Sequence, residues 1–201
     1  MNTRHRVALI GGGSGSGKTI ISEMFRGAYV LSMDNYFRGP FKMLAGGIPD
    51  WDNPKSVDFD EWIGDYHKIS YAMIHGTDTT IAKYDFKTQK LNKFKFCGKN
   101  HSWSWIIFEG LFALDKRLHQ FADLKIFVDA PFDVRISRRL KRDSKERASD
   151  LKFILNHSYY TEVSYKKYIQ PTKMFADIII PNYDSRDKPN ISNTLHDINQ
   201  L

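Results

Sequence analysis

The stretch VALIGGGSGSGKT, residues 7–19, joins a short apolar run to a glycine-rich loop. The end of this stretch matches the pattern G-x-x-x-x-G-K-[ST], with Gly12, Gly17, Lys18 and Thr19 at the defining positions. The apolar run predicts a buried strand, and a helix is expected to begin near Lys18. A strand, this loop and a helix in that order are the context in which the pattern marks a phosphate-binding loop.

The loop predicts a nucleotide site with Mg²⁺. Glycines allow successive backbone N–H groups to point at phosphate oxygens, and the N-terminus of the helix adds a favourable potential. Lys18 is expected to reach the β- and γ-phosphates, and Thr19 the metal. A glycine-rich turn without a ligand is the alternative, which the strand and helix around it disfavour. The residues expected to bind ATP here are Gly12, Gly13, Ser14, Gly15, Ser16, Gly17, Lys18 and Thr19.

Further apolar runs follow along the chain, and segments compatible with helices separate most of them. These runs are continuous rather than alternating, which indicates strands covered on both faces and therefore a parallel sheet flanked by helices. We predict an α/β fold, a doubly wound domain with a parallel five-stranded sheet. The expected strands are residues 7–10, 28–33, 105–110, 124–130 and 176–182.

The segment of residues 38–100 departs from this alternation. A loop rich in Gly, Pro and Asp comes first, and a helix is expected from Asp58 to about His75. Two short strand-like runs around a turn near residues 87–91 then predict an antiparallel hairpin, about residues 78–98. We interpret the hairpin as an insertion at the ligand edge of the sheet, where substrate specificity often resides.

Composition indicates one domain, residues 1–201. Of the 201 residues, 41% are hydrophobic, which is enough for one sizeable core. Cys97 is the single cysteine, so an internal disulfide framework is excluded. The N-terminal residues lack the long apolar stretch of a signal peptide or a membrane span. We expect a cytoplasmic protein with no membrane partner.

The net charge of +7 is concentrated in RISRRLKRDSKER, residues 135–147. Such a run suits nucleic acid, the phosphates of a nucleotide, or a plain solvated helix face. Its arginines recur at helical spacing. With the polar residues that follow, we expect a hinged helical lid, about residues 138–150, that places guanidinium groups on the transferring phosphate. The arginines at this spacing are Arg135, Arg138 or Arg139, and Arg142.

Two carboxylates follow apolar strands, at the edge where parallel sheets place their ligands. Asp34 lies in LSMDNYF, residues 31–37, and its alternative role is to cap a turn or helix. Glu109 ends the strand WIIFEG and is expected beside the loop as a ligand of Mg²⁺, its alternative being a surface acid. The GTPase patterns D-x-x-G and N-K-x-D do not occur. A small phosphotransferase remains, in which Asp34 accepts the proton of the acceptor hydroxyl.

The chain resembles the uridine kinase (uridine–cytidine kinase) family of P-loop nucleoside kinases. The resemblance rests on an ordered set of motifs that covers nearly the whole chain: GGSGSGKT, SMDNYF, DWDNPKSVDFD, KYDF, FEGLFAL, FVDAPFDVRISRRLKRD and PTKMFADIIIPN. It implies a P-loop kinase-like fold with the hairpin and the lid described above. It also implies ATP, or GTP, as the phosphate donor, together with Mg²⁺.

The resemblance assigns roles to matching positions. Asp34 is similar to the acid that orients and deprotonates the ribose 5′-hydroxyl. Asp52 is similar to the residue that binds the ribose hydroxyls, and Tyr84 to one that contacts the base. Arg139 and Arg142 resemble lid arginines that act on substrate and ATP phosphates. The resemblance further implies nucleotide contacts by Arg147, Pro181 and Asn182, and metal contacts by Thr19, Asp34 and Glu109.

Three positions differ from the residues usual in the family. Gln89 stands where the family has a base-reading histidine, and Ser149 and His157 stand where it has an arginine and a glutamine. We expect Gln89 and His157 to contact the substrate. A carboxamide both donates and accepts hydrogen bonds, so Gln89 can serve either uracil or cytosine. The differences leave the identity of the nucleobase open.

We therefore expect an ATP:nucleoside 5′-phosphotransferase that acts on uridine and cytidine. Nicotinamide riboside is the main rival substrate, because Trp51, Tyr84 and Phe86 could stack on a cationic ring. Two alternatives of other classes are a nucleic-acid-binding P-loop protein and an ATP-binding regulator that has lost catalysis. We expect a small-molecule partner and no nucleic acid, and a homo-oligomer is left open.

Overall fold

The structure is a computed structural model, and it describes residues 5–183 apart from 86–87, 89, 101–102 and 147–150. The last residues of the expected lid therefore lie outside the described part of the chain. The same holds for four residues singled out above, Phe86, Gln89, Arg147 and Ser149.

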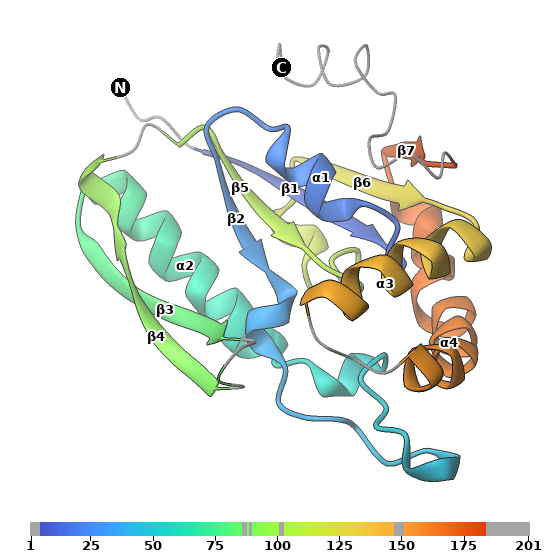
Figure 1. Cartoon of the computed structure of the whole chain (residues 1–201). Coiled ribbons are helices and arrows are strands. Elements are labelled where there is room, and N and C mark those ends of the chain that lie inside the picture. The colour runs from blue at the N-terminus through green and yellow to red at the C-terminus, as the bar shows by residue number, and fades with distance from the viewer. Residues whose placement is uncertain (1–4, 86–87, 89, 101–102, 147–150, 184–201) are drawn as a thin grey trace.

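A parallel five-stranded sheet forms the middle of the molecule (Figure 1). Its strand order is β2-β5-β1-β6-β7, so β1 lies between strands that come much later in the chain. The predicted α/β fold with a parallel five-stranded sheet is confirmed. The strands are β1 (Arg6–Gly12), β2 (Ala28–Ser32), β5 (Trp105–Glu109), β6 (Leu124–Asp129) and β7 (Ile178–Pro181).

The sheet is covered on both faces, as its continuous apolar strands predict. On one face, Ile21 of α1 (Lys18–Glu23) lies in a buried cluster with Ile10. On the other face, side chains of α2 (Phe59–His75) lie in a larger buried cluster with Leu9. Neighbours along β1 enter opposite clusters because side chains alternate across a strand.

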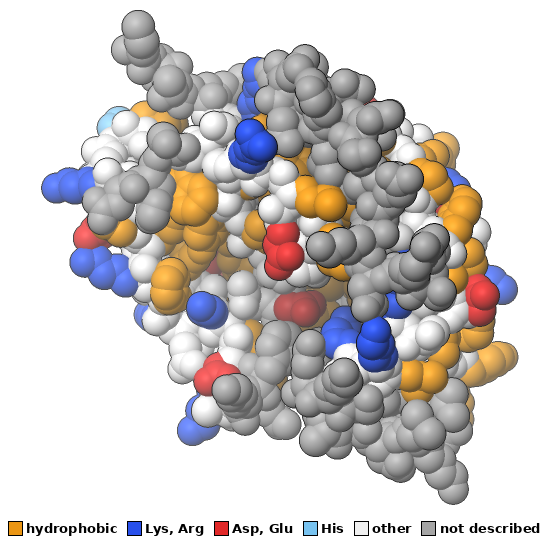
Figure 2. All heavy atoms as spheres, turned by 45° about the horizontal axis from the view of Figure 1, so that its top comes forward, with side chains coloured by type: hydrophobic (Ala, Val, Ile, Leu, Met, Phe, Trp, Pro, Cys, Tyr) orange, Lys and Arg blue, Asp and Glu red, His pale blue; other side chains and the backbone are white. Residues whose placement is uncertain are grey.

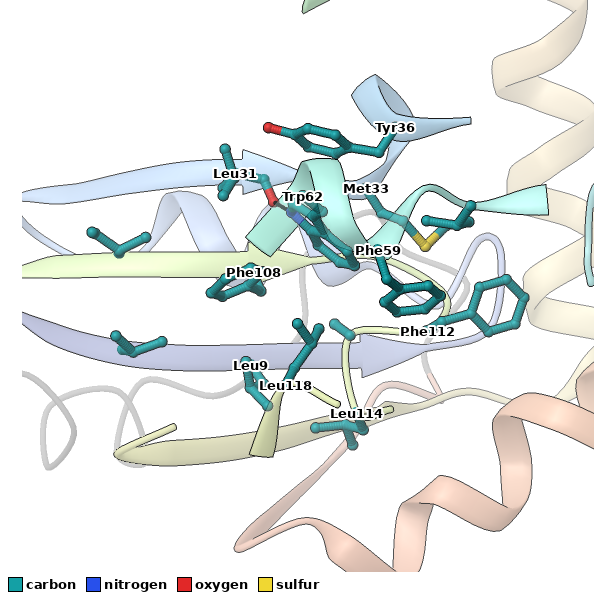
Figure 3. Close-up of a cluster of buried hydrophobic side chains, with 14 of the residues drawn as sticks. Leu9, Leu31, Met33, Tyr36, Phe59, Trp62, Phe108, Phe112, Leu114 and Leu118 are labelled. Carbon is teal, nitrogen blue, oxygen red and sulfur yellow. Dashed lines mark hydrogen bonds between the residues drawn. The ribbon is translucent and has the colours of Figure 1, made fainter. Parts of the chain in front are cut away.

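Trp62 of α2 occupies the larger cluster (Figure 3). Its ring stacks on Tyr36 with centroids 5.8 Å apart and lies 5.1 Å from the ring of Phe108. The indole N–H donates to the backbone oxygen of Leu31 at 3.1 Å, so the polar atom of this side chain is satisfied inside the core. The contact fixes α2 against the end of β2, immediately before the stretch that carries Asp34.

The helix α2 begins and ends close to the predicted positions. The carboxylate of Asp58 accepts a hydrogen bond from the N–H of Glu61 at 3.0 Å and caps the helix. Gly76 ends it in the left-handed conformation, with φ of 61°. The predicted helix from Asp58 to about His75 is confirmed.

The predicted hairpin is present as two antiparallel strands, β3 (Asp78–Asp85) and β4 (Lys90–Cys97). It forms a sheet of its own and lies with α2 on one side of the molecule (Figure 1). Asp65 of α2 anchors it, because its carboxylate accepts from the N–H of Ala82 at 2.7 Å. A pocket of about 200 Å³ lies between α2 and the hairpin, and its lining includes Asp65 but no residue of the phosphate loop.

Two helices complete the described chain before β7. α3 (Phe132–Glu146) carries the arginine run, and α4 (Leu151–Ser164) packs beside it. α3 begins six residues before the start of the expected lid at residue 138, and its first turn packs on the phosphate loop. The described part of the lid is thus a continuation of this helix. Among the described helices, none combines the length and apolar character needed to cross a membrane.

Candidate functional site

Two glycines give the phosphate loop its shape. Gly15 has φ of 80° and Gly17 has φ of 97°, a conformation that other residues rarely adopt. A Cβ atom on Gly15 would lie 2.5 Å from the backbone oxygen of Arg135, and one on Gly17 would lie 2.5 Å from the side-chain nitrogen of Asn182. The loop is therefore held between the start of α3 and the end of β7, with no room for side chains at these two positions.

Lys18 lies buried at the start of α1, with 8% of its surface exposed. Its ammonium group donates to the backbone oxygen of Gly13 at 3.0 Å, which folds the side chain back over the loop. Burial lowers the pKa of Lys18, while the charges of Glu109 and Asp34 act in the opposite direction. A cation held where water is scarce interacts strongly with a phosphate, because screening is weak there.

Glu109 lies at the end of β5, between the ends of β1 and β2. It pairs in register with Ile10 on one side and Ser32 on the other. The hydroxyl of Ser32 bonds the Glu109 carboxylate, and the same oxygen accepts from the N–H of Asp34 at 3.4 Å. Ser32 thus links the two candidate carboxylates, and it was not among the residues expected from the sequence. Ser32 lies two positions before Asp34 in the sequence, and this closeness is the signal that was missed.

Asp34 is not the capping residue of its turn. The side chain of Ser32 caps the short 3₁₀ helix η1 (Met33–Tyr36), and Asp34 lies in its first turn. The Asp34 side chain is half-buried, and its charge acts on both Lys18 and Glu109. The structure therefore places Asp34 with the charged groups beside the loop, as predicted for a catalytic acid, and its catalytic role stays a prediction.

Burial raises the pKa of Glu109 to about 6, and the nearby charge of Asp34 adds to this while Lys18 opposes it. The carboxylate is 7% exposed. A buried carboxylate whose charged form is disfavoured gains when a further cation arrives. The electrostatics of this site thus favour a bound cation.

The residues fit a complex of Mg²⁺ with a nucleotide. Mg²⁺ in such sites takes one or two carboxylates and fills its other positions with phosphate oxygens and water. Asp34, Glu109 and the exposed Thr19 are the residues that would hold it. The hydroxyl of Ser16 is buried in the loop without a hydrogen-bond partner in the described chain. No group of three or more His, Cys, Asp or Glu side chains suited to a metal occurs among the described residues, so the phosphates would have to complete the coordination.

The expected nucleoside contacts lie on the loop after β2 and on the hairpin. Asp52 is buried, and the ring of its neighbour Trp51 meets the ring of Phe37 edge-on at 5.6 Å. Tyr84 is half-buried, and its N–H donates to the side-chain oxygen of Asn35 at 2.9 Å. The strand expected to contact the base is thus tied to the residue next to the expected proton acceptor. Phe37 and Asn35 were not singled out in the sequence, although both belong to the quoted stretch LSMDNYF.

Arg139 and His157, both expected to contact the substrate, lie together between α3 and α4. The Arg139 guanidinium donates to the hydroxyl of Thr161 at 2.9 Å, and another of its nitrogens lies 3.4 Å from Nδ1 of His157. Each of the three side chains is buried. The structure therefore joins α3 to α4 through these side chains, and their contact with substrate stays a prediction.

Arg142 lies one turn beyond Arg138 on α3. Its Nε donates to the carboxylate of Asp143 at 2.8 Å, and its charge acts on Lys18 and Glu109. Arg142 is thus within electrostatic range of the loop, and its part in phosphate binding stays a prediction.

Arg135 does not carry a guanidinium to the transferring phosphate, contrary to our expectation. Its Nε donates to the backbone oxygen of Ala130 at 3.1 Å, and its guanidinium pairs with Glu162 and lies 4.0 Å from the ring centroid of Tyr165. It is 2% exposed, and its side chain packs against the loop at Gly13. Helical spacing alone could not show this, because it does not reveal which face of α3 is covered, and the covered face carries Arg135, Arg139 and Asp143.

Comparison with known proteins identifies the family of the chain. Residues 49–188 match the model of the phosphoribulokinase / uridine kinase family. Uridine-cytidine kinase-like 1 of Mus musculus is 34% identical over 184 residues, which cover 86% of this chain and 32% of the mouse protein. The uridine kinase of Streptococcus pyogenes is 32% identical over 182 residues, which cover 85% of this chain and 84% of the bacterial protein.

The solved structure of phosphoribulokinase from Rhodobacter spheroides has the same fold. It superposes with a TM-score of 0.61 at 16% identity, covering 92% of this chain and 73% of that one. Several curated relatives are much longer, and this chain spans only about a third of their length. The match over residues 49–188 nevertheless takes in most of the chain, and the phosphate loop that precedes it completes the site. The chain belongs to the phosphoribulokinase/uridine kinase family.

Proposed function

We propose that this protein is an ATP-dependent nucleoside kinase that phosphorylates the 5′-hydroxyl of a pyrimidine ribonucleoside. One observation carries the proposal: Lys18 at the start of α1, Asp34 just after β2 and Glu109 at the end of β5 interact electrostatically at the phosphate loop. A cation and two carboxylates in this place provide the groups that phosphoryl transfer needs.

The roles of the three residues follow from their surroundings. Lys18 neutralises charge that grows on the oxygen bridging the β- and γ-phosphates as the bond to the γ-phosphorus breaks. The nucleoside 5′-oxygen forms the new bond to that phosphorus, and its proton goes to the carboxylate of Asp34. Glu109 would hold Mg²⁺, which when bound neutralises phosphate charge. The products are ADP and the nucleoside monophosphate.

The nucleoside is expected between the stretch after β2 and the hairpin. Asp52 would accept hydrogen bonds from the ribose hydroxyls, while Trp51 and Phe37 offer aromatic surface to the base. The names of the relatives, uridine kinase and uridine-cytidine kinase, favour a pyrimidine. Tyr84 would contact the base from the hairpin, and Arg139 and His157 would contact the substrate from α3 and α4.

The arrangement of the basic run argues against the nucleic-acid alternative. A protein that binds nucleic acid through a basic helix presents a continuous exposed stripe. Here Arg135 and Arg139 are buried, and Arg138 and Arg142 are half-buried. On the face drawn in Figure 2, Lys and Arg side chains are scattered among acidic and hydrophobic ones.

The test is an ADP-release assay with ATP or GTP as donor and a panel of nucleosides as acceptor. We expect ADP release that depends on uridine or cytidine and on Mg²⁺, and that Lys18→Ala abolishes. Release with nicotinamide riboside alone would keep the kinase and replace the pyrimidine. Absence of nucleoside-dependent release, together with salt-sensitive binding of random oligonucleotides, would overturn the proposal in favour of a nucleic-acid-binding protein.

A further inference from the structure

The outward-facing carbonyl groups of the phosphate loop have side-chain partners from two distant parts of the chain. The amide of Asn182 donates from Nδ2 to the backbone oxygen of Ser16 at 2.8 Å. The guanidinium of Arg138 donates from Nη2 to Oδ1 of Asn182 at 3.0 Å. A second nitrogen of Arg138 makes two longer bonds, each 3.4 Å, to the backbone oxygens of Gly15 and Ser16.

Each of these two residues is also held in place by further contacts. Asn182 is 1% exposed, and its backbone N–H donates to the oxygen of Asp129 at 2.7 Å. Its side-chain nitrogen lies where a Cβ atom on Gly17 would come within 2.5 Å. Arg138 lies on α3, whose first turn packs on the loop at Gly15. The arrangement is therefore a built contact rather than a chance approach of a flexible side chain.

We propose that Arg138 and Asn182 form a carbonyl latch, which positions the loop for nucleotide phosphates without touching them. The inference rests on the proposed function, because it concerns the same nucleotide site. The carbonyl of Ser16 shares a peptide group with the N–H of Gly17, which the latch would direct at phosphate. The carbonyl of Gly15 shares one with the N–H of Ser16, which donates to the backbone oxygen of Gly13 at 3.0 Å and so keeps the loop folded. A hydrogen bond accepted by the oxygen of a peptide group strengthens the N–H of the same group as a donor. It also stops the peptide from turning its oxygen toward the phosphates.

The charge of Arg138 makes this effect larger than a neutral donor would. Hydrogen bonds with one ionised partner are roughly twice as strong as those between neutral groups. Asn182 then acts as a coupler, because its oxygen accepts from Arg138 while its nitrogen donates to Ser16. The latch thus joins β7 and α3, the two elements on either side of the loop.

The experiment measures the dissociation constant of ADP by calorimetry and the KM of uridine, or of the best nucleoside in the panel, for a set of variants. We expect Arg138→Ala and Asn182→Ala each to weaken ADP binding about tenfold or more, the effect of losing hydrogen bonds to a charged or buried group. Arg138→Lys keeps the charge but not the several donors of the planar guanidinium, so its ADP affinity should lie between those of Arg138→Ala and the wild type. The nucleoside KM should stay within about twofold, whereas a general loosening of the fold would raise it as well.

Lys141→Ala is the matched control, since it removes the same charge from the exposed side of the same helix. It should leave ADP affinity unchanged. The double variant of Arg138 and Asn182 tests the coupling, and we expect it to bind ADP little worse than Arg138→Ala alone. Fully additive effects would mean that Arg138 and Asn182 act independently of each other, and the coupled latch would be overturned.

Wild-type ADP affinity in Arg138→Ala and Asn182→Ala would also overturn it. Failure of the wild type to bind ADP would instead refute the proposed function. If Arg138→Ala does not fold, Arg138→Lys and Asn182→Ala carry the test.

Discussion

Asp34 and Glu109 are acids on neighbouring strand ends that experience different surroundings. Glu109 is almost fully buried, whereas Asp34 is half-buried and lies in the first turn of η1. The buried acid is suited to hold a cation, and the more accessible acid is suited to receive a proton from a substrate. Ser32 keeps the two at a set separation, because it bonds both.

The substitution Asp34→Asn should leave the protein folded and able to bind ATP but lower turnover about 10²- to 10⁴-fold, the range for a positioned general base. The amide keeps the shape of the side chain and cannot accept the proton. Steady-state ADP release and circular dichroism provide the comparison. Near-normal turnover would show that Asp34 has a purely structural part in its turn.

Glu109→Gln should stabilise the protein at pH 8 in the absence of nucleotide, with a chelator present to remove metal. The folded state raises the pKa of this carboxyl from 4.5 to about 6, so folding favours its protonated form. Stability is lost as pH rises through this window, by on the order of 2 kcal/mol when the group is fully charged. The neutral amide avoids the loss, so its advantage in urea denaturation should appear at pH 8 and vanish near pH 4.5. An equal effect at both values would contradict this account, and the same variant should lose Mg²⁺-dependent turnover.

Asp52 predicts a preference for ribonucleosides over 2′-deoxyribonucleosides. Removing one ribose hydroxyl would leave its buried carboxylate short of a partner, at a cost of about 1–3 kcal/mol. The ratio of kcat/KM for uridine and 2′-deoxyuridine measures this cost, and Asp52→Asn should reduce the ratio. Equal values for the two nucleosides in the wild type would assign Asp52 to another task.

At the residue scale, the sequence allowed prediction wherever a local pattern sets position. Lys18 could be placed because its pattern follows a strand and opens a helix, and Glu109 because it ends an apolar run. The Arg138–Asn182 contact could not, because it joins segments far apart in the chain. The closeness of Ser32 to Asp34 is visible in the sequence, but its bond to Glu109 depends on the pairing of β2 with β5. Arg135 was misplaced because helical spacing does not reveal which face of a helix is covered.

Among the elements, the hairpin stands apart because it shares no strand pairing with the main sheet. Two side chains fasten it. Asp65 accepts from Ala82 at 2.7 Å and from the hydroxyl of Tyr36 at 3.2 Å, and Asn35 accepts from Tyr84 at 2.9 Å. The hairpin and the turn that carries Asp34 are therefore anchored to the same points.

Asp65→Ala should lower the free energy of unfolding by about 3 kcal/mol, because it leaves buried donors on Ala82 and Tyr36 without an acceptor. Urea denaturation gives the value. Asp60→Ala, on the exposed side of the same helix, is the matched control and should change stability by less than about 0.5 kcal/mol. Equal stability of the two variants would show that the hairpin is held by its apolar contacts alone.

The existence of α2 and the hairpin could be predicted because each has strong local signals. Asp58 and Gly76 mark the ends of the helix, and two strand-like runs flank a short turn. Their placement on one side of the sheet could not be predicted in the same way. It depends on which face of α2 carries Trp62, and on a partner for its indole that lies on β2.

For the whole molecule, nucleotide binding should appear as global stabilisation, because the loop lies on the central strand. Mg²⁺–ADP at a hundredfold excess over its dissociation constant should raise the free energy of unfolding by about 2.7 kcal/mol. Thermal unfolding with and without ligand measures this. Lys18→Ala should lose most of the increase, whereas Lys166→Ala, an exposed lysine outside the site, should keep it. An unchanged increase in Lys18→Ala would contradict the placement of that ammonium on the phosphates.

The strand order also has a consequence for how the chain is made. Among the strands of the sheet β1 is synthesised first, yet its partners begin at Trp105 and Leu124, roughly a hundred residues later. At synthesis rates of about 5–20 residues per second, this strand waits roughly 5–20 s for its neighbours. During that interval α2 and the hairpin, whose contacts are local, can already form. The nascent chain therefore carries β1 as an uncovered apolar segment while the next hundred or so residues are made, and a chaperone could bind this segment during that period.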